Sequence, residues 1–348
     1  MKNLKQGDKV AIVSLSSGVL GEEFVSHELN LGIKRMQELG LEICFSPNAL
    51  KGIDYIKNNP KKRAEDLKWA FKDKSIKAII CAIGGNDGYL VNSFLLLDEE
   101  FLNIVKENPK IFVGFSDTTS HHLLLNSLGL KTFYGMSFLS DFCELDKEML
   151  PYSLNEFKTL FGFQKGRIIK SSDVWYKERK DYSSSQINIP RESVKENIGF
   201  LPLCKSGKVS GNLFGGCIEV LHKELMLKEN GESSLFNFIV KSQNKIVLIE
   251  TSEEKISPKE FEKMLIDLKN GGLFSSCNGV LVGKPEDNVN FEDYNKVIAK
   301  ELQSLNVPIM ANINIGHSQP HTILPFGALI SFDNNEKYIK IEQEIFEN

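Results

Sequence analysis

Short apolar runs that do not alternate with polar residues recur along the chain, separated by stretches with helical periodicity. Four of these runs lie in the first third of the chain, at positions 9–15, 41–47, 76–83 and 110–115. A strand that is apolar on both faces must be covered on both, so such strands interleaved with helices indicate a parallel sheet between helical layers. We therefore predict a doubly wound, flavodoxin-like α/β domain over residues 1–164, with functional groups at the carboxyl ends of its strands.

A second α/β pattern begins near residue 208. Apolar runs at 244–252 and 278–284 are interleaved with a helical stretch from Pro258 and another near 292–304. The last two runs of the chain alternate apolar and polar residues, which is typical of an antiparallel hairpin. We therefore expect a second, smaller α/β domain with a mixed sheet over residues 208–348.

Residues 165–207 separate the two patterns. They are polar and show no sustained period, so the sequence predicts a long connecting loop. A structureless connection of this length is uncommon unless it has a function.

Composition narrows the class of protein. The chain has 348 residues, a formal net charge of −4 and no basic stripe, which argues against a nucleic-acid polymer as partner. No apolar run approaches the roughly 18 residues that span a bilayer, and the first residues lack an apolar signal core. The six cysteines are scattered and form no CxxC pair, so we expect reduced thiols, no metal and no cofactor. These features predict a cytoplasmic protein without a membrane partner.

The stretch "KIFVGFSDTTSHHLLLNSLGL", residues 110–130, reads as a buried strand that runs directly into a helix, with Ser116 at the corner. One interpretation is a helix cap, because Ser, Asp and Thr side chains accept the free N–H groups of a first helical turn. The other is a nucleophile elbow, in which the corner projects a serine hydroxyl over the sheet edge. The stretch alone leaves both interpretations open.

Further polar side chains follow other strands. "VLIETSEE" (247–254) places Glu250 at the end of a strand, and "NIGHSQPHTILPFG" (314–327) places His317 in a loop just past another. Together with "AIGGND" (82–87), "GNLFGG" (211–216) and "GFSDTT" (114–119), these motifs make the chain resemble the L,D-carboxypeptidase family of serine peptidases over nearly its whole length. The 165–207 loop and "ETSEE" resemble the branch of microcin C immunity peptidases more than the murein-recycling enzymes.

The resemblance implies a role for each matching residue. Ser116 matches the nucleophile, His317 the base and Glu250 the acid of a catalytic triad, while the backbone N–H groups of Gly85 and Asp117 match the oxyanion hole. The chemistry asks for these residue types, because a serine hydroxyl needs a base and an imidazole is oriented by a carboxylate on its other nitrogen. The site is then expected at the interface of the two domains, and the family suggests a homodimer.

Two positions depart from the family pattern. The usual Gly-Gly-Asn of the second domain reads Gly215-Gly216-Cys217 here, and Asn86-Asp87 follow the first-domain glycines where murein-recycling relatives differ. Both departures put a simple transfer of murein specificity in doubt.

Several residues compete for the proposed roles. His121 and His122 lie on the helix after Ser116 and are expected to pack or cap, and His321 is a rival base for which we favour a structural role. Asp117 is expected to cap its helix with its side chain rather than act as the triad acid. The remaining rivals are two glutamates expected to be solvated and two cysteines for which nothing indicates an activated thiol: Glu253, Glu254, Cys81 and Cys217.

Substrate binding is assigned to Gly84, Trp175 and Tyr176. The two aromatic residues are either packing residues of the 165–207 loop or a stacking surface for a substrate ring, and the sequence leaves both open.

We expect a serine carboxypeptidase-type hydrolase that cleaves an amide bond in a small peptide or peptidyl-nucleotide substrate. The bond is either the L,D bond of a murein tetrapeptide or the amide between a peptide or amino acid and a nucleotide-like group. A non-catalytic ligand-binding protein on the same fold is the alternative, but it would not need Ser116, Glu250 and His317 together at strand ends. A class I amidotransferase would need cysteine in place of Ser116.

Overall fold

The computed structural model describes residues 1–162 and 165–347. Its first sheet has the strand order β14-β5-β4-β3-β1-β2. Strands β1 to β5 are parallel, in the 2-1-3-4-5 order of the flavodoxin-like folds, which confirms the predicted class. The six strands of this sheet are β1 (Lys9–Val13), β2 (Glu42–Phe45), β3 (Ile76–Cys81), β4 (Ile111–Gly114), β5 (Thr132–Tyr134) and β14 (Leu324–Phe326).

Both faces of this sheet are buried, as its continuous apolar strands require. On one face of the sheet, Val10 and Ile12 of β1 share a hydrophobic cluster with Met36. On the other face, Ala11 and Val13 share a second cluster with Leu67. The helices of the first half are α1 (Ser26–Glu38), α2 (Ile53–Asn58), α3 (Pro60–Lys72), α4 (Tyr89–Leu95), α5 (Glu99–Glu107), α6 (Thr119–Ser127) and α7 (Pro151–Lys158).

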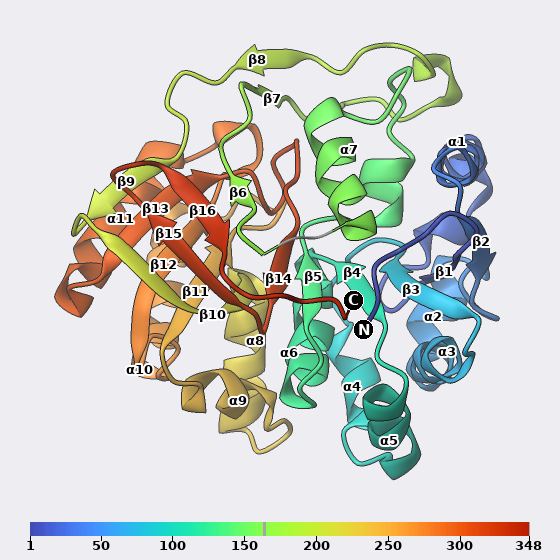
Figure 1. Ribbon diagram of the computed structural model, residues 1–348, viewed down its shortest axis with the longest axis horizontal. Helices are drawn as coiled ribbons and strands as arrows, with labels where there is room; N and C mark the ends of the chain where they lie inside the picture. The colour runs from blue at the N-terminus through green and yellow to red at the C-terminus, as the bar shows by residue number, and fades with distance from the viewer. Residues whose placement is uncertain (163–164, 348) are drawn as a thin grey trace.

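The second sheet is mixed, as predicted. Its centre, β10-β11-β12-β13, is parallel, and antiparallel strands flank it on both sides (Figure 1). The eight strands are β6 (Ile168–Ile169), β9 (Leu201–Cys204), β10 (Lys208–Cys217), β11 (Lys245–Glu250), β12 (Cys277–Gly283), β13 (Pro308–Ile313), β15 (Leu329–Asp333) and β16 (Tyr338–Ile341). The accompanying helices are α8 (Ile218–Glu229), α9 (Leu235–Lys241), α10 (Pro258–Asn270) and α11 (Phe291–Leu302).

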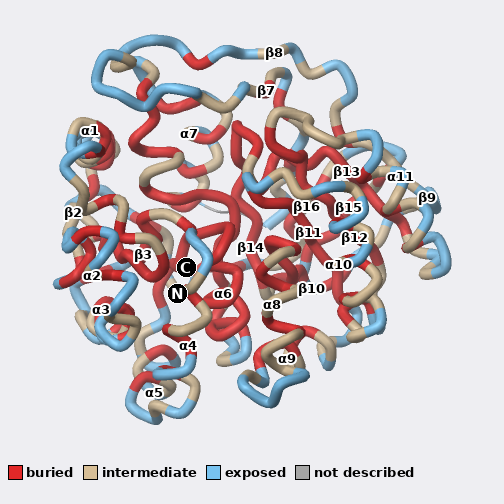
Figure 2. The backbone as a smooth tube through the Cα atoms, turned by 180° about the vertical axis from the view of Figure 1, so that it is seen from behind, coloured by how far each residue is buried: buried red, intermediate tan, exposed pale blue. Residues whose placement is uncertain are grey.

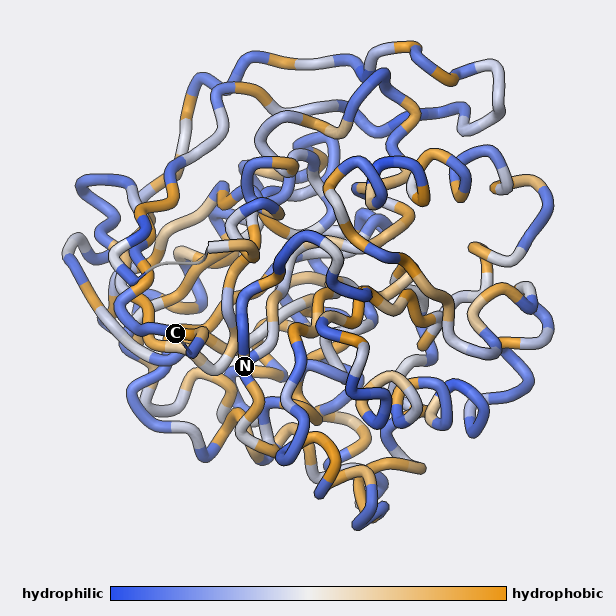
Figure 3. Tube along the Cα trace, turned by 45° about the vertical axis from the view of Figure 1, so that its right-hand side comes forward, coloured by the Kyte–Doolittle hydropathy of each residue, from blue (hydrophilic) through white to orange (hydrophobic). Residues whose placement is uncertain are grey.

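Local sequence explains individual boundaries. α10 begins at Pro258, as expected, and Ser257 with Glu260 forms a capping box before it. β15 and β16 form the predicted closing antiparallel hairpin. The buried strands form the interior in Figure 2, and Figure 3 shows hydrophobic segments concentrated there.

The two halves are joined by more than one connection. β14 comes from the second half but pairs with β5 of the first sheet. β6 and β9, from the predicted loop, extend the second sheet at its two edges. The predicted end of the first domain, at residue 164, lies outside the described residues. The termini also meet, since the N-terminal amine lies 2.8 Å from Glu347 Oε1.

Residues 165–207 are therefore not a structureless connection. Besides β6 and β9 they contain the two-stranded antiparallel ribbon of β7 (Val174–Tyr176) and β8 (Ser193–Lys195). The segment between β7 and β8 passes beyond α7 at the top of Figure 1 and is largely exposed in Figure 2.

Candidate functional site

Ser116 lies at the corner between β4 and the 3₁₀ turn Ser116–Thr118, which leads into α6. Its φ angle is +62°, in the left-handed region that a non-glycine residue rarely adopts. A strained strand-to-helix turn of this kind is how a nucleophile elbow exposes its side chain. The structure therefore favours the elbow over the helix cap, and neither the turn nor α6 has a side-chain cap.

Three side chains from distant parts of the chain meet at this corner. His317 Nε2 lies 2.9 Å from Ser116 Oγ, and His317 Nδ1 lies 2.8 Å from Glu250 Oε2. Glu250 is the last residue of β11, and His317 lies in the loop between β13 and β14. The three residues thus lie at or just past the carboxyl ends of strands from the two sheets, and they form the Ser–His–acid arrangement of serine hydrolases.

A fourth side chain, Glu253, contacts the same imidazole. Its Oε2 lies 3.0 Å from His317 Nε2, the nitrogen that also faces Ser116. Burial lowers the pKa of His317, but the carboxylates of Glu250 and Glu253 outweigh it and raise that pKa well above its ordinary value. Glu253 was expected to be solvated; its side chain is 61% exposed, yet its carboxylate reaches His317.

Tyr134 was not anticipated from the sequence. Its hydroxyl donates to Glu250 Oε1 at 2.6 Å and accepts the backbone N–H of Ser116 at 3.1 Å. The tyrosine is fully buried at the end of β5. One phenol thus links the acid to the backbone of the serine and fixes their spacing. An aromatic residue at the end of an apolar strand carries no sequence signal for this role.

Gly84 lies beside Ser116, and Gly85 lines the same cavity. A Cβ atom at Gly84 would lie 2.8 Å from Ser116 Oγ and 3.4 Å from the backbone nitrogen of Asp117. Only glycine therefore leaves the space around the hydroxyl open. Gly84, Ser116 and the backbone nitrogen of Asp117 thus lie together, and the oxyanion-hole role of the Gly85 and Asp117 N–H groups stays a prediction.

The Asp117 side chain has a different role from the one expected. It does not cap its own helix; its Oδ2 accepts the backbone N–H of Gly88 at 2.7 Å and the hydroxyl of Ser16 at 2.5 Å. Gly88 immediately precedes α4, so the carboxylate ties the corner to the start of a neighbouring helix. The prediction failed because a side chain at a corner reaches neighbours that are remote in sequence.

The cysteine at the altered family position is buried. Cys217 Sγ donates to Glu219 Oε2 at 3.0 Å, and its backbone N–H donates to Thr119 Oγ1 at 3.0 Å. A Cβ at the preceding Gly216 would lie 2.4 Å from Thr119 Oγ1, so β10 packs directly on the start of α6. Burial raises the pKa of Cys217 well above its ordinary value, as it does for Cys81, and neither thiol is activated.

The remaining histidines near the corner have structural partners. His121 Nδ1 lies 2.8 Å from Asn92 Oδ1, and His122 is held between Thr132 and the Gly114 carbonyl. Burial lowers the pKa of both rings to about 3, so both stay neutral. His321 Nδ1 lies 2.8 Å from Asp141 Oδ1 and 2% of its side chain is exposed. All three fit the packing roles expected of them.

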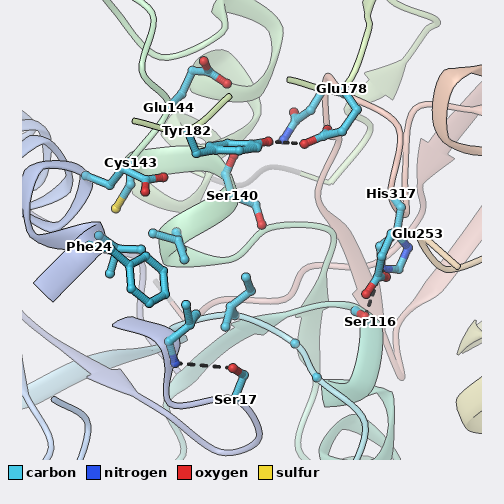
Figure 4. A pocket seen from close by; sticks show the side chains of 18 of the residues that line it. Ser17, Phe24, Ser116, Ser140, Cys143, Glu144, Glu178, Tyr182, Glu253 and His317 are labelled. Carbon is cyan, nitrogen blue, oxygen red and sulfur yellow. Dashed lines mark hydrogen bonds and ion pairs between the residues drawn. The ribbon is translucent and has the colours of Figure 1, made fainter. Parts of the chain in front are cut away.

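A cavity of about 990 Å³ opens beside Ser116 and His317. Gly84 and Gly85 line it close to the serine. Figure 4 shows Ser116, His317 and Glu253 on one side, Phe24 and Cys143 on the other, and the ring of Tyr182 between them at the top. A cavity of this volume accommodates a ligand the size of a nucleotide conjugate.

Trp175 and Tyr176 are not among the residues that line this cavity. Trp175 is 8% exposed, and Lys284 Nζ lies 5.1 Å from the centre of its ring. Lys284 in turn pairs with Glu196 at 2.8 Å, so the tryptophan belongs to a buried contact between the β7–β8 ribbon and the second sheet. The Tyr176 backbone N–H donates to the carbonyl of Gln319. The structure thus favours the packing interpretation for Trp175.

Tyr182, six residues after Tyr176, is the aromatic residue of this segment that lines the cavity. Its hydroxyl contacts Glu178, and His27 Nε2 lies 2.8 Å from its backbone carbonyl. Trp175 and Tyr176 stand out in the sequence as two adjacent aromatic residues, whereas Tyr182 is a single one in the same polar segment.

Within the two described ranges, no group of three or more His, Cys, Asp or Glu side chains is placed to hold a metal ion. Among the same residues, no helix combines the length and apolar character needed to cross a membrane.

The fold and this arrangement of side chains are those of a peptidase class. Residues 10–135 match the model of the LD-carboxypeptidase N-terminal domain, and residues 210–332 match that of the LD-carboxypeptidase C-terminal domain. The chain belongs to the LD-carboxypeptidase family.

Three similar proteins illustrate the range of this family. A crystal structure of an MccF-like protein from Streptococcus pneumoniae in complex with AMP is 45% identical, with a TM-score of 0.90 over 96% of this chain and 98% of that one. A probable murein peptide carboxypeptidase from Bacillus subtilis is 25% identical over 99% of this chain and 95% of its own length. The microcin C7 self-immunity protein MccF from Escherichia coli is 25% identical over 90% of this chain and 87% of its own length.

Proposed function

We propose that the protein is a serine hydrolase that cleaves the amide bond between an aminoacyl or peptidyl group and a nucleotide. The observation that carries this proposal is the cavity that starts at Ser116 and extends to the exposed rings of Phe24 and Tyr182. Two aromatic rings in a large cavity suit a planar base, since aromatic stacking contributes roughly 1–3 kcal/mol per base. The AMP bound by the Streptococcus pneumoniae protein supports a nucleotide as part of the substrate.

In the proposed mechanism, Ser116 Oγ attacks the amide carbonyl carbon while His317 Nε2 takes the hydroxyl proton. Glu250 holds the imidazole by its other nitrogen and stabilises the imidazolium that forms. The N–H groups of Gly85 and Asp117 stabilise the oxyanion. The imidazolium then gives its proton to the leaving nitrogen, and water releases the acyl group from Ser116 by the reverse sequence.

The second candidate is hydrolysis of the L,D bond of a murein tetrapeptide, which the name of the Bacillus subtilis relative favours. The same triad would serve both substrates, so the far end of the cavity decides between them. The homodimer stays a prediction from the family resemblance, and the cytoplasmic location stays a prediction from the sequence composition.

The test compares the purified protein on aspartyl sulfamoyl adenosine and on a murein tetrapeptide, with kcat/KM measured for each by chromatography of the products. We expect the nucleotide substrate to be preferred by at least about tenfold. A preference for the tetrapeptide would overturn the nucleotide assignment while leaving the hydrolase intact.

Tyr182 gives a sharper version of this test. Tyr182→Ala is expected to raise KM for the nucleotide substrate about tenfold, because stacking of this kind is worth roughly 1–3 kcal/mol. Tyr182→Phe keeps the ring and is expected to keep the KM. Ile189→Ala is the matched control, since Ile189 is exposed in the same segment and does not line the cavity.

A further inference from the structure

The end of the cavity opposite Ser116 has a wall built from residues 23–28, which lead into and form the first turn of α1. Cys143, Glu144 and Tyr182 complete this end. Phe24 is 64% exposed there and Tyr182 is 43% exposed. The proposed triad chemistry uses none of these residues, so the wall needs an explanation of its own.

Glu28 is the unusual residue in this wall. It is 4% exposed, yet it lines the cavity. Within the part of the chain that the structure describes, its carboxyl group has no hydrogen-bond partner, and its one ion-pair contact is His27 Nε2 at 4.0 Å. That histidine nitrogen is itself 2.8 Å from the carbonyl of Tyr182.

The other buried acidic residues around the cavity, Glu144 and Glu286, have close partners. Glu144 contacts Arg179 and Arg191, and Glu286 pairs with Lys255 at 2.7 Å. A carboxyl group that faces a cavity and bonds no protein group keeps its hydrogen-bonding capacity for a ligand. Glu28 therefore points to a ligand group that the free protein lacks.

The protonation of Glu28 defines what it can bind. Burial and the neighbouring Glu144 raise its pKa to about 7, so near neutral pH a large fraction carries the proton. A protonated carboxyl presents one O–H donor beside one acceptor oxygen. The charged or titratable groups that face it are His27 on its own helix, 4.0 Å away, and Cys143 and Glu144 from the segment after β5.

We propose that Glu28 binds the amino edge of an adenine-type base. Its acceptor oxygen receives an N–H of the exocyclic amine, and its O–H donates to the adjacent ring nitrogen. Phe24 and Tyr182 line the same cavity and offer two rings to the faces of a planar base. This inference rests on the proposed nucleotide function and adds a base preference to it.

The experiment measures the affinities of AMP and of purine riboside 5′-monophosphate, which lacks the amine, by calorimetry at pH 6, 7 and 8. The ratio of the two affinities cancels the ionisation of the phosphate. For the native protein we expect about a tenfold preference for AMP at pH 6, because only AMP carries the amine. The affinities of both nucleotides should fall relative to those of Glu28→Gln as the pH rises through the pKa of Glu28, because both nucleotides use the O–H bond to the ring nitrogen.

Two variants and a control separate this role from a structural one. Glu28→Gln keeps a donor and an acceptor, so it is expected to retain the preference for AMP. Because the glutamine does not titrate, this variant should not show the loss of affinity with rising pH that Glu28 causes in the native protein. Glu28→Met is expected to bind both nucleotides equally. Glu38→Gln is the control, because Glu38 is an exposed glutamate on the same helix that does not line the cavity, and it should behave as the native protein does.

Equal affinities in the native protein, or a preference that survives in Glu28→Met, would overturn the base assignment and leave the nucleotide function standing. If the native protein binds neither nucleotide, both proposals fail. If Glu28→Met does not fold, the pH dependence of the AMP affinity is compared between the native protein and Glu28→Gln. Equal pH dependences would refute the assignment.

Discussion

Glu253→Gln should move the acid limb of the pH–rate profile to lower pH. In the free protein, the Glu253 carboxylate contacts the same imidazole nitrogen that must accept the Ser116 proton. The carboxylate stabilises the imidazolium, which cannot act as a base. The native profile should therefore rise above the ordinary histidine range, because Glu250 and Glu253 hold the pKa of His317 well above 6.5.

The size of the shift follows from the geometry. At 3.0 Å, two unit charges in a medium as polar as water attract by about 1.4 kcal/mol, which corresponds to about one pKa unit. The dielectric constant of water is appropriate because the Glu253 side chain is 61% exposed. Removing the charge should lower the apparent pKa in kcat/KM by about one unit and raise activity most at acidic pH.

The assay records kcat/KM from pH 5 to 9 for the native protein, Glu253→Gln and Glu254→Gln. Glu254 is the matched control, since it is the adjacent exposed carboxylate and makes no contact with His317 among the described residues. If the acid limbs of Glu253→Gln and Glu254→Gln coincide, Glu253 does not raise the pKa of His317.

Three further substitutions test the support around the site. Tyr134→Phe removes the hydroxyl between Glu250 and the Ser116 N–H. It should lower the free energy of unfolding by about 1–3 kcal/mol and lower kcat, and an unchanged denaturation midpoint would contradict this expectation. Trp175→Ala should cost about 3–5 kcal/mol of stability with equal effects on nucleotide and peptide substrates, and a selective loss on the nucleotide would restore its predicted stacking role. Gly84→Ala should lower kcat at least about a hundredfold with little change in thermal unfolding, because the added methyl lies 2.8 Å from Ser116 Oγ; near-native turnover would show that the serine needs no such space.

The class of the fold was predictable because a strand buried on both faces is a continuous apolar run in the sequence. Runs such as 76–83 become the central strands of the first sheet, and the closing alternation becomes β15 and β16. The pairing of β14 with β5 was not predictable, because a three-residue strand carries too little pattern to say which sheet it joins. The same holds for β6 and β9 within the predicted loop.

The site was predictable where a residue type is tied to a strand end. Ser116, Glu250 and His317 were each selected in this way, and the structure brings them into contact. Tyr134 escaped because its partners are remote in sequence and its residue type is common in cores. Trp175 misled because an aromatic residue in a polar segment has the same sequence signature whether it faces a ligand or packs on Lys284.

The central claim is that Ser116 and His317 act as one catalytic unit. Its most direct test is the kcat of Ser116→Ala, His317→Ala and the double variant on aspartyl sulfamoyl adenosine. Each single substitution should lower kcat by several orders of magnitude, and the double variant should lose little more, because residues that act together are not additive. Near-native turnover in Ser116→Ala, or losses that multiply in the double variant, would contradict the claim.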